Sequence, residues 1–285
     1  MKYKIEPLAN YHCECGENPL WDDQREAVYW EDIPKGRVFR YDVRTGQHRI
    51  IYEGEQVGGF TLQTDGTLLL FQKDKLGRLD PDGDHTWLGK KIDVGDARFN
   101  DVIADPKGRV FAGTEAKDPK VGGIFRIDPD GKGTRVFTGT SCSNGMAFSD
   151  DFRHLYWTCS MARKISRFDY NMETGELSNR RDFVNVPEKE GIPDGMTRDT
   201  EGNFWSARWD GYAVIKHAPD GKTIAKIDFP VAKVSSVIFG GKKMNELYVT
   251  TAGGAEGSGA ADGTLYRVKT QARGVPEFRS RVCIR

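Results

Sequence analysis

The chain has 285 residues, of which 38% are apolar and 29% charged, so a sizeable core can form and wholesale disorder is excluded. Its 42 basic and 42 acidic side chains cancel, which argues against nucleic acid or an anionic membrane surface as a partner. We find no signal peptide and no apolar stretch long enough to span a membrane, and an odd number of cysteines, five, fits a reducing compartment. We therefore expect a cytoplasmic protein.

Short runs rich in Val, Ile, Phe, Tyr and Trp follow one another along the chain, separated by turns of Gly, Asp and Pro. Period-two alternation is clear at 36–43 and 122–129, and no segment has a sustained helical period. Six runs align by their apolar positions. In chain order they are GENPLW (16–21), GGFTL (58–62), FNDVIA (99–104), SNGMAF (143–148), PDGMTR (193–198) and SSVIFG (235–240).

Each run is followed by a second strand and by a marker such as IDPDG (127–131), which closes a third strand with a tight turn. A unit of about 40 to 50 residues with four short strands is typical of a β-propeller blade. The sequence thus predicts an all-β, six-bladed propeller with four-stranded blades, in one domain over 1–285. The β-prone ends, 3–8 and 277–285, are expected to complete one blade together, so deleting 277–285 should destabilise the whole fold.

The first strand of a propeller blade lines the central channel, so equivalent first positions should meet at the hub. These positions hold Glu17, Gly58, Asn100, Asn144, Asp194 and Ser235. Two carboxylates and two amides in a partly desolvated channel favour a divalent cation. Taken singly, Asn144-Gly145 and Asp194-Gly195 could be ordinary turn residues, but their coincidence at one repeat position favours a metal site.

The motifs GENPLW, RFNDVIADPKGRVFAGT, SNGMAFSDD, SNRRDFVNVPEKEGIPDGMTRDTEGNFW and VIFGGKKMNELYVTT, which span most of 16–252, resemble those of the senescence-marker-protein/gluconolactonase/regucalcin-like lactonases. The resemblance implies one divalent metal on Glu17, Asn144 and Asp194, with calcium expected and magnesium, manganese or zinc as alternatives. It also implies substrate contacts from Arg98 and Asn100, and from Asp118 or the nearby Glu115. The family's opening motif is often GEGP, so Asn18 places a larger side chain after the metal ligand.

The expected reaction is hydrolysis of a sugar lactone to the aldonic acid, with the metal polarising the carbonyl, Asp194 as general base and Glu17 holding charge and geometry. Trp209, Asp210 and Tyr212 could form a wall for a sugar face or could serve packing between blades. Two alternatives stay open: a phosphotriesterase- or paraoxonase-like hydrolase on the same metal site, and a non-catalytic calcium-binding propeller.

Overall fold

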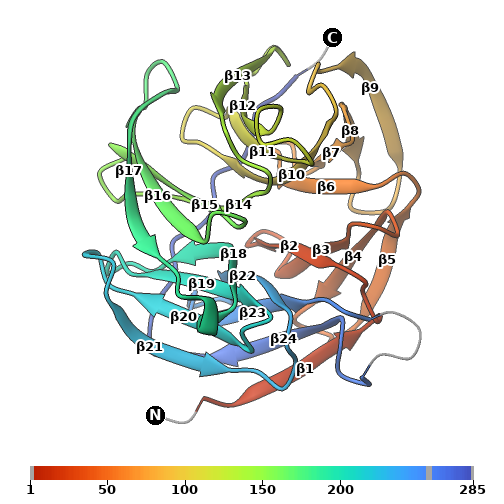
Figure 1. Cartoon of the computed structure of the whole chain (residues 1–285). Coiled ribbons are helices and arrows are strands. Elements are labelled where there is room, and N and C mark those ends of the chain that lie inside the picture. Colours follow the sequence, from red (N-terminus) through yellow and green to blue (C-terminus); the bar gives the residue numbers. More distant parts are fainter. Residues whose placement is uncertain (1–2, 255–258, 284–285) are drawn as a thin grey trace.

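The computed structural model describes residues 3–254 and 259–283, and in these residues 24 strands form six antiparallel four-stranded sheets arranged as a ring (Figure 1). The predicted six-bladed propeller is confirmed. Blades 1 and 2 contain β2 (Gly16–Asp22), β3 (Ala27–Asp32), β4 (Arg37–Asp42), β5 (His48–Glu53), β6 (Val57–Leu62), β7 (Leu68–Gln72), β8 (Lys75–Leu79) and β9 (His85–Lys91). Blades 3 and 4 contain β10 (Ala97–Ala104), β11 (Val110–Ala116), β12 (Gly123–Ile127), β13 (Gly133–Thr138), β14 (Ser143–Phe148), β15 (His154–Cys159), β16 (Lys164–Asn171) and β17 (Glu176–Asn185). Blades 5 and 6 contain β18 (Ile192–Arg198), β19 (Phe204–Trp209), β20 (Ala213–His217), β21 (Thr223–Asp228), β22 (Val234–Gly240), β23 (Glu246–Thr251), β24 (Thr264–Lys269) and β1 (Ile5–Asn10).

The apolar core lies between neighbouring blades. The cluster between blades 2 and 3, for example, joins Phe71 to Phe99, whose rings meet edge to face with centroids 5.3 Å apart. Inner strands such as β2 and β14 are buried along their whole length, which explains why their sequences do not alternate. Outer strands such as β17 are largely exposed. A short 3-10 helix, Glu188–Glu190, precedes β18.

The DPDG-type markers form the turns between third and fourth strands, as predicted. In the turn at Asp128, the Gly131 amide donates to the Asp128 carbonyl at 2.8 Å, and Gly131 has φ 76°, a conformation that glycine adopts without strain.

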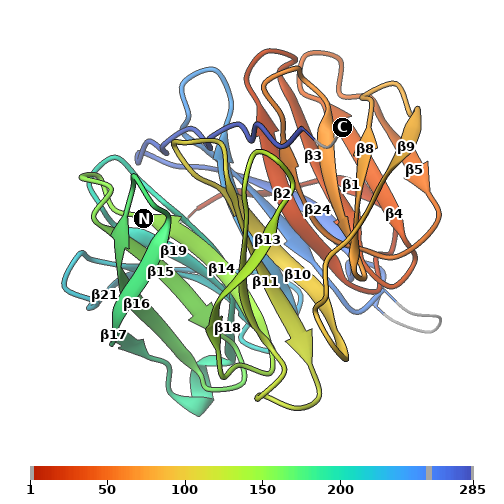
Figure 2. The same cartoon turned by 90° about the horizontal axis from the view of Figure 1, so that it is seen from above.

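The ring is closed by β1, which pairs with β24 at the outer edge of blade 6. The expectation that 277–285 shares in that blade is wrong, because β1 already occupies the free edge of β24. Residues 277–283 instead cross one end of the ring (Figure 2), and residues 284–285 lie outside the described part of the chain. The Ser280 amide donates to the Leu62 carbonyl at 2.8 Å, and the Cys283 amide donates to the Pro129 carbonyl at 2.8 Å.

All six inner strands share one irregularity that positions the hub. Each breaks its register with the second strand of its blade close to the first position predicted from sequence. In β2 the break falls between Glu17 and Leu20, and in β10 between Phe99 and Val102. A bulge of this kind bends a strand and redirects a side chain. Because the bulge recurs in all six blades, each hub residue lies next to a break in the pairing between the first and second strands.

Candidate active site

Four of the predicted hub side chains line one cavity of about 340 Å³: Glu17, Asn100, Asn144 and Asp194. Each is only 5 to 6% exposed, so the four groups have lost most of their contact with water. They come from blades 1, 3, 4 and 5 and are brought together only by closure of the ring. The other two first positions, Gly58 and Ser235, do not line this cavity.

Glycines at the hub allow neighbouring inner strands to approach closely. A Cβ at Gly58 would lie 1.9 Å from the Phe99 carbonyl oxygen, and one at Gly195 would lie 1.9 Å from Ser236 Oγ. Similarly, a Cβ at Gly145 would lie 2.4 Å from the Met196 amide nitrogen. Asn144-Gly145 and Asp194-Gly195 are thus parts of strands β14 and β18, not turns, and their glycines are required by packing between blades.

The two amides are held in fixed orientations. Asn144 Nδ2 donates to Ser160 Oγ at 3.0 Å, and Ser160 Oγ donates to the Pro193 carbonyl at 2.7 Å. Asn100 Nδ2 donates to the Ser143 carbonyl at 2.9 Å and approaches Asn144 Oδ1 at 3.3 Å. The side-chain nitrogen of Asn144 therefore points toward its own blade, and its side-chain oxygen points toward the hub.

The two carboxylates of the site carry strongly perturbed acidities. Burial raises the pKa of Glu17 to about 8, and the charge of Asp101 is the next cause. Burial also raises the pKa of Asp194 well above its usual range, followed by the charge of Glu17. Asp194 Oδ1 is buried and has no hydrogen-bond partner among the described residues. An unpartnered oxygen, a second buried carboxylate and an oriented amide oxygen fit a hard divalent cation.

Arg98 forms a polar wall of the cavity. Its Nη1 donates to Asn100 Oδ1 at 3.0 Å and to the Phe99 carbonyl at 3.0 Å, and its Nη2 pairs with Glu115 Oε2. Glu115, at the end of β11, lines the cavity, whereas Asp118 is exposed and does not. The Asp118 carboxylate instead accepts the Lys120 amide at 2.8 Å in a surface turn.

An apolar wall faces the cavity from blades 4 and 5. Trp209 is half-buried and paired across the strands with Ile192, and Lys233 Nζ lies 5.1 Å from the Trp209 ring centroid. Met161, 65% exposed, stands beside them in the lining. Of the aromatic stretch noted in the sequence, only Trp209 lines the cavity; Tyr212 is 53% exposed elsewhere.

Some lining residues escaped the sequence reasoning. Ser160, Met161, Cys15 and Cys142 all lie just before an inner strand or just after a second strand. The signal that could have found them is this repeated position at the strand ends, rather than their residue type. Asn18, by contrast, does not line the cavity: its amide donates to Glu17 Oε2 at 2.9 Å, and its side chain faces the other end of the hub. The larger residue after Glu17 therefore leaves access to the cavity unchanged.

Comparisons with known proteins agree with this geometry. The family model described as SMP-30/Gluconolactonase/LRE-like region matches residues 15–253. The chain belongs to this family. The resemblance read from the motifs is thereby confirmed. A pentonolactonase of Haloferax volcanii is 45% identical over 285 residues, covering 96% of this chain and 97% of its own. Regucalcin of Homo sapiens is 34% identical over 259 residues, covering 87% of each chain.

The family's fold is also seen in a solved structure, that of a calcium-binding protein, regucalcin, from Agrobacterium tumefaciens. It covers 99% of both chains with a TM-score of 0.91 at 23% identity, a level that shows the fold alone. In the described part of this chain, no group of three or more His, Cys, Asp or Glu side chains could hold a metal ion. A cation at the hub therefore needs the amide oxygen in addition to Glu17 and Asp194. No helix within the described ranges is long and apolar enough to cross a bilayer.

Proposed function

We propose that this chain hydrolyses a sugar lactone to the corresponding aldonic acid, with one divalent metal ion held by Glu17, Asn144 and Asp194. The observation that carries the proposal is the convergence of two buried carboxylates and an oriented amide in one cavity that also contains Arg98. The 45% identity to a pentonolactonase along nearly the whole chain supports an enzyme of the lactonase class. Calcium is the expected ion, with magnesium, manganese or zinc as alternatives.

The polar wall would orient the lactone. Arg98 has donors for the substrate's hydroxyl or carbonyl oxygens, and its contacts to Asn100 and Glu115 hold the guanidinium in place. Trp209 offers an apolar surface to the C–H face of the ring. A bound divalent ion would supply Lewis-acid polarisation of the lactone carbonyl.

Asp194 is the proposed general base. A carboxylate that would hold the ion through one oxygen keeps its other oxygen free, and that oxygen of Asp194 can accept a proton from a water molecule as the water adds to the carbonyl carbon. The ring C–O bond then breaks, and the proton passes from Asp194 to the departing ring oxygen, which becomes the hydroxyl of the open acid. Glu17 fixes the geometry of the floor, since its Oε2 accepts the Asn18 backbone amide, and its carboxylate would offset the charge of the bound ion.

The test is acid release from purified protein given arabinono-, xylono-, galactono- and gluconolactone near neutral pH, with chelator and after metal is restored. We expect hydrolysis above the spontaneous rate that chelator abolishes and metal restores. Release at the spontaneous rate from metal-loaded protein would overturn the proposal. A paraoxon assay addresses the phosphotriesterase alternative, and a metal-induced melting shift without turnover on any ester would indicate a non-catalytic propeller.

A further inference from the structure

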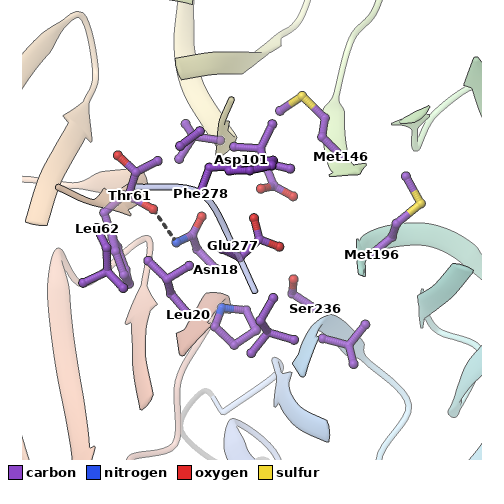
Figure 3. Close-up of a pocket in the computed structure, with 17 residues that line it drawn as sticks. Asn18, Leu20, Thr61, Leu62, Asp101, Met146, Met196, Ser236, Glu277 and Phe278 are labelled. Carbon is purple, nitrogen blue, oxygen red and sulfur yellow. Dashed lines mark hydrogen bonds between the residues drawn. The ribbon is translucent and has the colours of Figure 1, made fainter. Parts of the chain in front are cut away.

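A second, smaller cavity of about 40 Å³ lies at the other end of the hub, beneath the C-terminal segment (Figure 3). Its polar lining consists of Asn18, Thr61, Asp101, Ser236 and Glu277, and its apolar lining includes Met146, Met196 and Phe278. None of these residues lines the larger cavity. The space fits one small ion with a water molecule or two, and is too small for a sugar.

The same bulges that build the larger cavity direct these groups away from it. Asn18 and Asp101 directly follow Glu17 and Asn100, with φ values of 49° and 52°. Neighbouring residues of an inner strand thus serve opposite ends of the hub. Glu277 does not belong to a blade and is delivered by the segment that crosses the ring (Figure 3).

The two carboxylates in this cavity lack side-chain partners among the described residues, and the Asp101 carboxylate accepts the backbone amide of Val102. Within residues 3–254 and 259–283, neither the Asp101 nor the Glu277 carboxylate has an ion pair or a hydrogen bond from another side chain. Asn18 is only 8% exposed, and its Nδ2 donates to the Phe60 carbonyl at 3.0 Å, which fixes the amide. Asn18 Oδ1 has no described partner and is directed to the same space as the two carboxylates (Figure 3).

Two negative groups in so small a space repel each other unless something neutralises them. The pKa of Glu277 is raised to about 7, first by burial and then by the charge of Asp101. The charge of Arg198 counteracts this, but Arg198 forms its ion pair with Asp150. Two carboxylates and an amide oxygen that accepts no described hydrogen bond are the ligand types that hard cations prefer.

We propose that this cavity is a second cation site, in which Asp101, Glu277 and Asn18 Oδ1 bind a hard divalent ion of the calcium type. Ser236 Oγ and water complete the ligand shell. The ion joins blades 1 and 3 to the C-terminal segment, so it fastens that segment across the hub. The site does not depend on the proposed hydrolysis, because none of its ligands faces the larger cavity.

Calorimetric titration of the chelator-stripped full chain with Ca²⁺ tests the proposal. We expect two ions per chain in the wild type and one in Glu277→Gln, with the remaining ion bound by the unchanged pair Glu17 and Asp194. Asn18→Gly, which suits the positive φ and keeps the amide donor to Glu17, should weaken the second site at least about tenfold. Glu188→Gln, an exposed change near β18, is the matched control and should keep two ions.

A Glu277→Gln variant that binds as many ions as the wild type overturns the second site, whether the wild type binds two ions or one. If Glu277→Gln binds no ion because it is misfolded, Asn18→Gly decides the matter: unchanged affinity in that variant also overturns the proposal. Failure of the lactonase proposal would look different, since it would leave two ions bound and no lactone hydrolysed.

Discussion

Glu17 and Asp194 are the residues on which the proposed chemistry most depends. Asn and Gln replacements keep their size but remove the charges that a divalent ion neutralises. We expect Glu17→Gln and Asp194→Asn each to weaken metal binding at the hub about 100-fold and to lower turnover by about 10² to 10⁴. Calorimetry and initial rates measure the two effects. Asp96→Asn, at an exposed position outside the cavity, is the control, and wild-type turnover in Asp194→Asn would contradict the assigned role.

The acidic contact to substrate should come from Glu115 rather than Asp118, because only Glu115 lines the cavity and pairs with Arg98. Glu115→Gln should raise KM about tenfold by loosening the guanidinium, which corresponds to about 1.4 kcal/mol. Asp118→Asn should leave KM within about twofold, since it alters a surface turn. Steady-state kinetics on the best lactone decides between them, and the reverse result would restore Asp118 as the contact.

Trp209 should contribute to binding rather than to the chemical step. Trp209→Ala removes the apolar wall, so we expect KM to rise about tenfold while kcat changes little. Tyr212→Ala is the matched control, because Tyr212 is a nearby aromatic residue that is exposed and outside the cavity. Equal effects of the two substitutions on KM would show that Trp209 serves packing between blades.

At the scale of the elements, strands β19 and β20 enclose a buried pair that should make stability depend on pH. His217 is 1% exposed, and its Nε2 lies 2.8 Å from the Arg208 guanidinium. Burial, and then the charge of Arg208, lowers the pKa of His217 to about 4 from 6.5. The unfolded chain therefore binds this proton first as the pH falls.

The stabilisation from neutral His217 is present above pH 6.5 and is lost as the pH falls from 6.5 to 4, by at most about 3 kcal/mol. Urea unfolding from pH 7 to pH 4.5 should show a shallower loss of stability in His217→Gln than in the wild type. The exposed His48→Gln is the control and should follow the wild type. Parallel curves for all three proteins would mean that His217 does not titrate differently on folding.

The elements also show how much of the structure could be predicted from the sequence. The inner strands could be placed because a repeat gives each residue five counterparts, so Glu17, Asn100, Asn144 and Asp194 could be assigned to the hub by position. Ser160 and Met161 could not be assigned, because their approach to the hub depends on how one blade packs on the next. The segment 277–283 has no counterpart in the repeat, and its path depends on Ser280 and Val282 burying themselves against blade 2.

For the whole molecule, the position of β1 predicts which chain end closes the ring. Deleting 3–10 would free the edge of β24 and should lower the melting temperature far more than deleting 277–285. The second deletion leaves every described strand paired, although it removes the buried Val282, the hydrogen bonds of the buried Ser280 to blade 2 and the ion pair of Arg279 with Asp22. Calorimetric scans of both truncated proteins check this, and equal losses would mean that the C-terminal segment holds the ring as firmly as β1.

The break in register shared by the six inner strands has a consequence for how such a protein can change. Regular pairing resumes on both sides of each break, so a residue at the break carries chemistry while contributing little to the ladder that supports it. Selection, or a designer, can exchange these few residues for another set and so obtain another reaction, while the surrounding sequence is inherited unaltered.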